Sequence, residues 1–277
     1  MDLLPILLFP RYRGFVCDFM PYAVSAMSPR ILKFIKLAVM PAYWPDLRLG
    51  VAATVEHGAA FRKDVFGTVI DVGANKGQFA VFAVHRWPHA RLICFEPLPG
   101  PRAMLARATR GRADIHDCAL GSGAGEATMH LASREDSSSL LPLGARQKAI
   151  FGMQESGVLQ VPVRRLDACL SGPLRRPVLL KIDVQGYELE VLKGANDLLA
   201  AIDVIFVEAS CVELYEGQAL DRDVLQLLTS KGFYLAGRFN NQRYQEALVQ
   251  ADLLFRRPGA DSARASLTAR SGKAGLE

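Results

Sequence analysis

A run of glycines and polar side chains at residues 71–78 combines residue types that bind an anionic or nucleoside ligand. The segment reads Asp-Val-Gly-Ala-Asn-Lys-Gly-Gln and follows a short β-branched apolar run. Glycines where a strand meets a helix allow a tight turn and let a ligand approach the backbone. The helix that follows offers free N–H groups at its N-terminus. Glu96 lies 19 positions beyond Gly77, where an acidic side chain can accept both ribose hydroxyls of a nucleoside. The spacing predicts a nucleoside-containing cofactor.

Two common nucleotide motifs do not match this segment. The dinucleotide pattern G-x-G-x-x-G would begin at Gly73, but Asn75 and Gln78 occupy its second and third glycine positions. The Walker A pattern is also absent. Asp71, acidic and just before the glycine turn, suits a cationic amino-acid group better than a phosphate. These residues favour S-adenosylmethionine, which carries an ammonium group, a sulfonium and a ribose.

The elements that must position these residues alternate between strand and helix from about residue 67. Repeated alternation of this kind predicts a mostly parallel sheet with helices on both faces, and ligands bind at the carboxyl edge of such a sheet. A long polar segment at 133–158 lacks periodicity and is expected to be a functional loop. The predicted strands are 67–74, 91–97, 113–120, 125–132, 159–167, 177–184, 201–210 and an antiparallel closing pair, 233–240 and 247–257. The predicted helices are 76–87, 99–110, 187–200 and 221–232.

Six segments together resemble the FkbM-type S-adenosylmethionine-dependent methyltransferases. They are VIDVGANKGQFA, CFEPLPG, ALGSGAGEA, SSSL, VRRLD and LLKIDVQGYELEVLKGA, in this order, and the resemblance covers about residues 60–256. It implies the α/β class I methyltransferase fold, a Rossmann-like, seven-stranded, mostly parallel sheet with an antiparallel last strand and helices on both faces. The expected organisation is an N-terminal helical extension at 1–60, a methyltransferase domain at 61–257 and a disordered tail at 258–277.

The resemblance also implies roles for individual residues. Asp71, Gly73, Asn75 and Gly77 would hold the methionine end of the donor, and Glu96 would take the ribose. Asp117 would be the candidate on the adenine side, with Asp114 as a competitor. Asp183, Gln185 and Tyr187 would face the transferring methyl group.

Position 185 departs from the family pattern, which usually reads I-D-V-E-G-Y-E. This chain has glutamine where glutamate is usual. Glutamine forms hydrogen bonds but cannot act as a base or carry negative charge. A catalytic role for this position is therefore not expected.

Asp183 and Glu208 lie at the ends of two neighbouring predicted strands and are the candidate catalytic residues. A hydroxyl acceptor is a poor nucleophile while protonated, so a base or a metal ion would help methyl transfer. Asp183 could act as general base, or Asp183 and Glu208 could bind a divalent cation. In the remaining interpretation, Asp183 only positions the donor and Glu208 only caps loop amides. Two carboxylates alone are a small ligand set for a hard cation.

Charge and cysteine content limit the function classes. The net charge of +5 comes from the ends, because residues 1–66 and 256–277 each carry +3 and residues 67–255 carry −1. A neutral core argues against a nucleic-acid partner, since phosphate contacts need clustered basic side chains. The five cysteines lack C-x-x-C spacing, so neither a disulfide framework nor a zinc site is expected, and the chain is predicted to be cytoplasmic.

The basic and apolar segment 30–44 has two interpretations. It is either a helix packed on the domain or a helix lying on an anionic membrane surface. The second would place the protein peripherally at the inner membrane.

The sequence therefore predicts an O-methyltransferase that uses S-adenosylmethionine and acts on a hydroxyl of a small molecule or glycan, with a polysaccharide or glycolipid sugar favoured. A nucleic-acid methyltransferase and a non-catalytic S-adenosylmethionine-binding protein are the alternatives. A nicotinamide-dependent oxidoreductase is disfavoured by the missing glycines.

Overall fold

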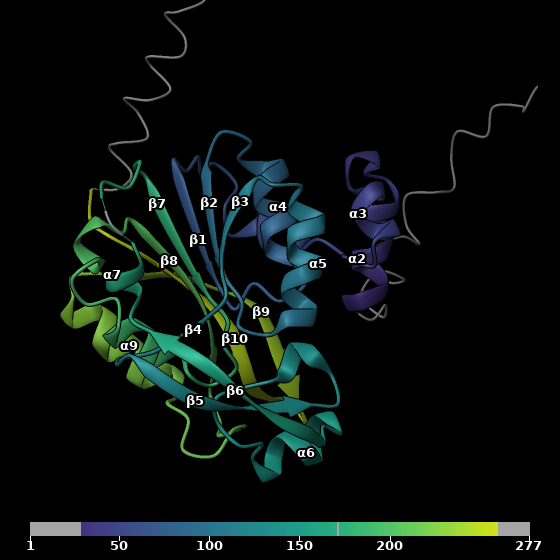
Figure 1. Cartoon of the computed structure of the whole chain (residues 1–277), viewed down its shortest axis with the longest axis vertical. Helices are drawn as coiled ribbons and strands as arrows, with labels where there is room; N and C mark the ends of the chain where they lie inside the picture. The colour runs from purple at the N-terminus through teal and green to yellow at the C-terminus, as the bar shows by residue number, and fades with distance from the viewer. Residues whose placement is uncertain (1–28, 171, 260–277) are drawn as a thin grey trace, which may run out of the picture.

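The alternation of strands and helices from residue 68 onward builds one large sheet with helices on both faces (Figure 1). The computed structural model describes residues 29–170 and 172–259. The strands of the large sheet are β1 (Thr68–Val72), β2 (Arg91–Phe95), β3 (Ala113–His116), β7 (Val178–Ile182), β8 (Val204–Ser210), β9 (Tyr234–Tyr244) and β10 (Ala247–Arg256).

The strand order is β3-β2-β1-β7-β8-β10-β9. The first five strands pair in parallel, and β10 pairs antiparallel with both β8 and β9. The chain runs outward from β1 to β3 and then returns to the other side of β1 with β7. This topology confirms the expected fold class, including the antiparallel last strand. The reversal between β1 and β7 is the point where ligands bind in sheets of this kind.

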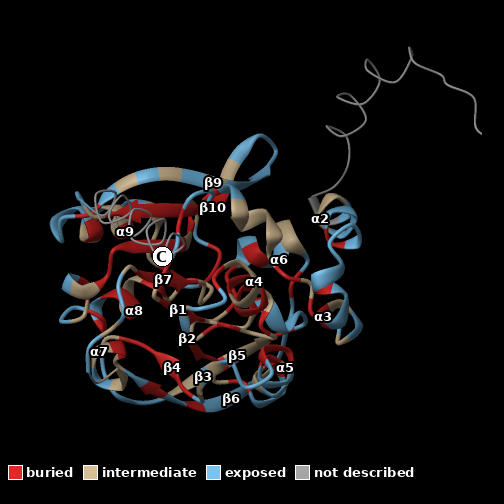
Figure 2. Ribbon diagram, turned by 90° about the horizontal axis from the view of Figure 1, so that it is seen from above, coloured by how far each residue is buried: buried red, intermediate tan, exposed pale blue. Residues whose placement is uncertain are grey.

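Helices cover both faces of the sheet, with α4 and α5 on one side (Figure 1) and α8 and α9 on the other (Figure 2). The α-helices are α2 (Pro29–Ala38), α3 (Trp44–Arg48), α4 (Gln78–Arg86), α5 (Pro99–Thr109), α6 (Ala145–Phe151), α7 (Leu166–Cys169), α8 (Glu188–Lys193) and α9 (Asp221–Ser230). The 3-10 helices are η1 (Pro41–Tyr43), η2 (Val55–Ala59), η3 (Glu135–Ser137) and η4 (Leu199–Ala201).

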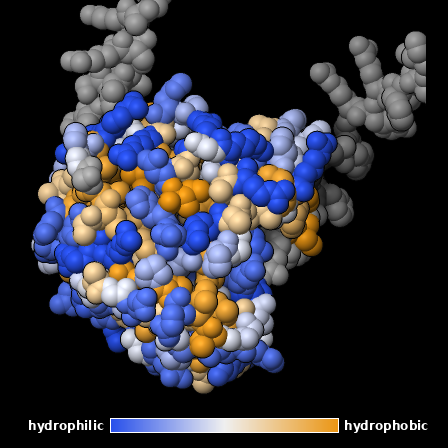
Figure 3. All heavy atoms as spheres, in the orientation of Figure 1, coloured by the Kyte–Doolittle hydropathy of each residue, from blue (hydrophilic) through white to orange (hydrophobic). Residues whose placement is uncertain are grey.

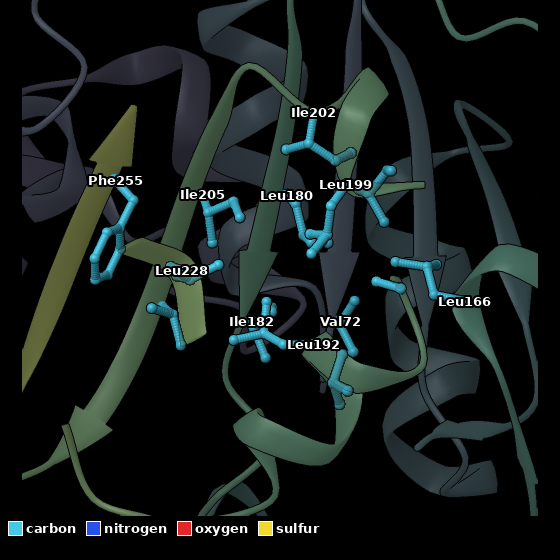
Figure 4. Close-up of a cluster of buried hydrophobic side chains, with 14 of the residues drawn as sticks. Val72, Leu166, Leu180, Ile182, Leu192, Leu199, Ile202, Ile205, Leu228 and Phe255 are labelled. Carbon is cyan, nitrogen blue, oxygen red and sulfur yellow. The ribbon is translucent and has the colours of Figure 1, made fainter. Parts of the chain in front are cut away.

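Two apolar cores form because successive strand residues point to opposite faces of the sheet. Ile70, Ile182 and Leu228 belong to the core beneath α8 and α9, which Figure 4 shows in close-up. Val69 and Phe206 belong to the opposite core beneath α4. Figure 2 shows the central strands as buried, whereas most of β9 is partly or fully exposed. Burial on both faces explains why the central strands read as continuous apolar runs.

A second sheet of three strands lies beside the carboxyl edge of the large one. Its order is β4-β6-β5, with β4 (Ala119–Leu120), β5 (Gly125–Ala132) and β6 (Glu155–Arg164). The strand predicted over 113–120 is therefore wrong as a single element. His116 ends a strand of the large sheet and Ala119 begins a strand of the small one, so the chain changes partner between them.

Two other elements differ from the prediction. The segment 133–158 is not one loop, because it contains η3, α6 and the start of β6. The helix predicted over 187–200 is divided: α8 ends at Lys193 and η4 begins at Leu199. Gly194 follows α8, and a Cβ there would lie 2.0 Å from the Gly121 carbonyl oxygen. This close backbone approach requires glycine at the end of the helix.

In the described part of the chain, the α-helices α2 and α3 and the 3-10 helices η1 and η2 precede the first strand. The segment 30–44 is interrupted at Pro41, where α2 has ended and η1 begins. Leu37 and Tyr43 are buried and join the core beneath α4. No helix within the described ranges is long and apolar enough to span a membrane. The cysteines at 94, 118, 169 and 211 are free, whereas Cys17 and most of the predicted tail lie outside the described residues.

Candidate active site

A cavity of about 340 Å³ opens at the carboxyl edge of the large sheet, near the strand reversal. This volume is in the range of small-molecule sites in proteins. The sequence-predicted residues on its wall are Gly73, Asn75, Glu96, Asp183, Gln185, Tyr187 and Glu208. Residues at the carboxyl ends of four different strands, β1, β2, β7 and β8, are thus brought together, as expected for a parallel sheet.

The glycine turn places three left-handed residues at alternate positions. The φ angles are +75° at Gly73, +46° at Asn75 and +95° at Gly77. Asparagine is one of the few other residues that tolerate this conformation, which explains its presence in the middle of the turn. A Cβ on Gly73 would lie 1.9 Å from the Asp183 carbonyl oxygen, so glycine is required there. The turn brings its backbone against the end of β7.

Glu96 is held in a fixed orientation on the cavity wall. Its Oε2 accepts a hydrogen bond from the Asn75 backbone N–H at 2.8 Å, and its Oε1 accepts one from the Leu98 N–H at 2.8 Å. The side chain is 5% exposed. Burial raises its pKa to about 7, although the two backbone donors act in the opposite direction. An oriented carboxylate with remaining lone pairs is suited to accept the hydroxyls of a ribose.

Asp71 lies behind the glycine turn and faces a lysine. The Lys181 ammonium is 3.1 Å from Asp71 Oδ1 and 3.5 Å from Asp183 Oδ2, and both Lys181 and Asp71 are buried. Burial raises the pKa of Asp71, and Lys181 opposes this. Burial lowers the pKa of Lys181, but Asp71 and Asp183 outweigh it, so the net shift is upward. This buried charge network connects β1 with β7.

Three predicted cofactor residues do not lie on the described cavity wall. They are Asp71, Gly77 and Asp117. Asp117 is exposed, whereas the adjacent Cys118 lines the cavity. Gly77 packs against α5, since a Cβ there would lie 3.0 Å from Leu105. Their roles toward the donor remain predictions.

Gln185 joins the two candidate catalytic carboxylates. Its Nε2 donates to Asp183 Oδ1 at 2.7 Å and to Glu208 Oε2 at 3.0 Å. Its backbone is left-handed, with φ of +57°. Burial raises the pKa of Glu208 well above its usual range, and Asp183 and Asp252 add to the shift. The amide bridges two carboxylates that would otherwise face each other without a donor between them.

A tyrosine and a serine hold Gln185 in place. The Tyr215 hydroxyl lies 2.9 Å from Gln185 Oε1 and 2.9 Å from the Ser137 carbonyl oxygen, and it accepts a hydrogen bond from Gln147 Nε2 at 3.0 Å. Burial raises the pKa of Tyr215, so this hydroxyl stays protonated. Ser139 Oγ donates to the Gln185 carbonyl oxygen at 2.7 Å. The polar segment after β5 therefore supports the catalytic side of the cavity.

No group of three or more His, Cys, Asp or Glu side chains in the described ranges is arranged to hold a metal ion. The Gln185 amide nitrogen contacts both Asp183 and Glu208, so a neutral donor links the carboxylates that a cation would need as ligands. This arrangement offers no third ligand to a cation bound between Asp183 and Glu208.

The sequence interpretation missed Lys181 and Tyr215. Lys181 had a readable signal, because a lysine inside the apolar run VLLKI needs a buried partner. Tyr215 had none, since it contacts Gln185 across 30 positions of the chain. Gln185 was predicted to face the transferring methyl group, but its hydrogen bonds to Asp183 and Glu208 were not predicted.

The topology, the glycine turn and the carboxylate oriented for a ribose define a Rossmann-like methyltransferase that uses S-adenosylmethionine. Residues 71–235 match the sequence profile of the methyltransferase FkbM domain. The chain belongs to the FkbM methyltransferase family.

Relatives of this chain carry the same kind of activity in their names. The 2-O-methyltransferase NoeI of Sinorhizobium fredii (strain NBRC 101917 / NGR234) is 31% identical over 199 residues, covering 68% of this chain and 78% of NoeI. The 31-O-demethyl-FK506 methyltransferase FkbM of Streptomyces tacrolimicus is 28% identical over 204 residues, covering 65% and 76% of the two chains. Among solved structures, magnesium protoporphyrin IX methyltransferase (ChlM) from Synechocystis PCC 6803 with bound SAM shares 12% identity at a TM-score of 0.40, covering 89% and 87%.

Proposed function

We propose that this protein transfers a methyl group from S-adenosylmethionine to a hydroxyl oxygen of a sugar in a glycan or glycolipid. The proposal rests on the polar side chains that line the cavity beyond the cofactor turn. Beside Asp183, Gln185 and Glu208, this wall includes Gln242 and Gln250. Amide and carboxylate groups that converge on one cavity are suited to a ligand with several hydroxyls. The names of NoeI and FkbM, which both specify an oxygen as the methylated atom, support the same reaction type.

The donor would lie across the carboxyl ends of β1 and β2. The turn from Gly73 to Gly77 would hold its methionine end by backbone groups. Asp71 lies behind this turn, paired with Lys181, and would contribute to the charge of the site. Glu96 would accept the ribose hydroxyls, and Asp117 would be the candidate beside the adenine. The sulfonium supplies an activated methyl group, so the protein mainly has to orient the acceptor oxygen.

Asp183 and Glu208 are proposed to position the reacting groups. Both carboxylates already accept hydrogen bonds from the Gln185 amide, and Asp183 also faces Lys181. This arrangement favours positioning over proton abstraction by Asp183.

Isothermal titration calorimetry followed by a transfer assay tests this function. We expect S-adenosylmethionine and S-adenosylhomocysteine to bind and NAD⁺ not to bind. Tritiated S-adenosylmethionine is then incubated with a panel of methyl glycosides, with glycolipid and polysaccharide extracts, and with RNA. Label in a sugar supports the proposal. Label in RNA alone, or binding without transfer to any acceptor, contradicts it.

A peripheral membrane contact through residues 30–44 is proposed for the N-terminal helices. Six large apolar side chains there are exposed: Ile31 51%, Phe34 58%, Ile35 47%, Val39 75%, Met40 38% and Trp44 45%. Figure 3 shows hydrophobic and hydrophilic residues side by side over α2 and α3. Lys36 and Arg48 are exposed beside them, whereas Asp46 is buried and paired with Arg110. An apolar face with a basic border suits an anionic lipid surface.

This surface lies next to the cavity. Lys33 lines the cavity and pairs with Glu56 at 3.0 Å, while the next turn of the same helix exposes its apolar side chains. An acceptor sugar linked to a lipid would therefore reach the cavity from the membrane surface.

A further inference from the structure

One wall of the cavity is made by a histidine on η2, which precedes the sheet in the chain. The His57 ring packs edge-on to Phe206 with centroids 5.1 Å apart, and its centroid is 5.7 Å from that of Phe79. Its Nε2 lies 3.4 Å from Asp252 Oδ2 on β10. The imidazole is thus held by two aromatic rings and one carboxylate, and it lines the cavity.

The other ring nitrogen of His57 is not engaged. Nδ1 is buried and has no hydrogen-bond partner within the described part of the chain, and the same is true of Thr54 Oγ1 three residues earlier. Thr54 also lines the cavity. Buried polar atoms are normally paired, so two unpaired ones on the wall of a ligand cavity indicate groups that the ligand completes. A ligand hydroxyl can donate to a bare imidazole nitrogen and accept from a threonine hydroxyl.

The strand order separates this histidine from the cofactor turn. The turn follows β1 and Glu96 follows β2, whereas His57 packs against β8 through Phe206 and against β10 through Asp252. Asp252 pairs directly with Glu208 across these two strands. Between the two ends lies β7 with Asp183. The donor would occupy the end of the cavity beside β1 and β2, so His57 lies at the other end, which remains for the acceptor. The reacting atoms would meet between these two ends.

The two carboxylates near the middle of the cavity already have a hydrogen-bond donor. Asp183 and Glu208 both accept hydrogen bonds from the Gln185 amide. His57 is different, because its Nδ1 carries no hydrogen bond while its Nε2 faces a carboxylate. A carboxylate beside one nitrogen orients the ring, fixes the proton on that nitrogen and leaves the other as the basic atom. The next charged groups are Asp71 on β1, whose pKa the charge of His57 lowers, and Lys181 on β7, which pairs with Asp71.

We propose that His57 is the general base of the transfer and that Asp252 positions it. This inference rests on the proposed function. As the acceptor O–H bond breaks, its proton passes to His57 Nδ1, and an oxygen electron pair forms the new bond to the methyl carbon. The bond between that carbon and sulfur breaks with its electron pair remaining on sulfur. The products are the methyl ether, S-adenosylhomocysteine and an imidazolium that Asp252 stabilises. Thr54 binds the acceptor at the same end of the cavity.

The test compares His57→Gln with a matched control on the same fold. His85 also faces a buried aspartate, with Nε2 3.3 Å from Asp46 Oδ2, but it does not line the described cavity. Three measurements are made on the full chain: affinity for S-adenosylmethionine by calorimetry, kcat and KM with a saccharide acceptor methylated by the wild type, and the pH profile of kcat. His57→Ala is assayed with and without added imidazole.

We expect His57→Gln to lower kcat about 100-fold or more and to remove the acid limb of its pH profile. Its affinity for S-adenosylmethionine should stay within about twofold of the wild type, and His85→Gln should keep kcat. Imidazole should restore part of the activity of His57→Ala, which a purely structural role would not allow. Asp252→Asn should lower kcat about tenfold and serves as the second variant if His57→Gln does not fold.

The outcomes separate this inference from the proposed function. If the wild type binds the donor but methylates no saccharide, the proposed function fails and the general base fails with it. If the wild type turns over and His57→Gln keeps kcat within about threefold with an unchanged pH profile, only the general-base role is overturned. Loss of donor affinity in parallel with kcat would also overturn it, because His57 would then support the cofactor.

Discussion

Replacement of Glu96 by glutamine isolates the charge of the proposed ribose ligand. Glutamine keeps the size of the side chain, but one of its two terminal atoms is a donor. In the native site both terminal oxygens accept backbone N–H groups, from Asn75 and from Leu98. One of these N–H groups would then face another donor and lose its partner. An unpaired buried donor costs about 1–3 kcal/mol. We expect the free energy of unfolding and the free energy of S-adenosylmethionine binding to weaken by amounts of this order.

The pH dependence follows from the raised pKa of Glu96, which is about 7 compared with an unfolded value of 4.5. The folded state binds the proton more tightly, so this contribution to stability is complete below the unfolded pKa and is lost as pH rises through about 7. The affinity for the methyl donor should instead rise with pH, because ribose hydroxyls donate hydrogen bonds to the ionised carboxylate. About one tenth of the sites are ionised at pH 6 and about nine tenths at pH 8. The ligand should therefore bind roughly tenfold more tightly at pH 8.

Calorimetry with S-adenosylhomocysteine at pH 6, 7 and 8 measures this dependence. Glu188 provides a matched control: it is 4% exposed, burial raises its pKa to about 7, and it accepts the N–H groups of Gly186 and Val184. It does not line the described cavity. Glu188→Gln should lower thermal stability yet keep the tenfold pH effect, whereas Glu96→Gln should abolish it. A pH effect that survives in Glu96→Gln, or a flat profile in the wild type, would refute the assignment of Glu96 to the ribose.

Three further perturbations test the rest of the site and the N-terminal surface. Gln185→Glu replaces the bridging amide by a third carboxylate, so we expect a loss of about 1–3 kcal/mol at pH 8 that is relieved at pH 5; equal melting-temperature losses at both pH values would contradict the bridge. Gly73→Ala brings a Cβ to 1.9 Å from a backbone oxygen and should cost at least about 3 kcal/mol by urea unfolding, whereas Gly123→Ala, with open space around it, should stay within about 0.5 kcal/mol. Phe34→Glu should reduce co-sedimentation with anionic vesicles about tenfold, and Val158→Glu, equally exposed at 57%, should not; equal partitioning of both variants argues against the membrane contact.

Local features of this protein could be predicted because neighbouring residues carry them. Gly73, Asn75 and Gly77 specify a turn through their own backbone preferences, and the position of Glu96 follows from one strand–helix–strand unit. The apolar runs of β1, β7 and β8 predict a sheet buried on both faces, and their alternation with helices makes most of it parallel. The fold class and the edge that holds the cavity were therefore readable without the structure.

Element boundaries were less predictable where tertiary contacts compete with propensity. The run 113–120 is uniformly strand-like, yet its two halves join different sheets. The helical pattern over 187–200 is interrupted where Gly194 packs against the backbone of Gly121. In both places the deciding partner lies far away in the chain, so no local pattern records it.

The chemistry of the cavity depends on such distant partners. The sequence by itself determined which strand ends carry Asp183 and Glu208, because each follows an apolar run directly. Only the tertiary structure placed Gln185 between them and Asp252 beside His57, 195 positions away in the chain. Which strands are neighbours depends on how the whole sheet buries its apolar faces. That collective choice decides which side chains share a hydrogen bond and which nitrogen remains free to take a proton.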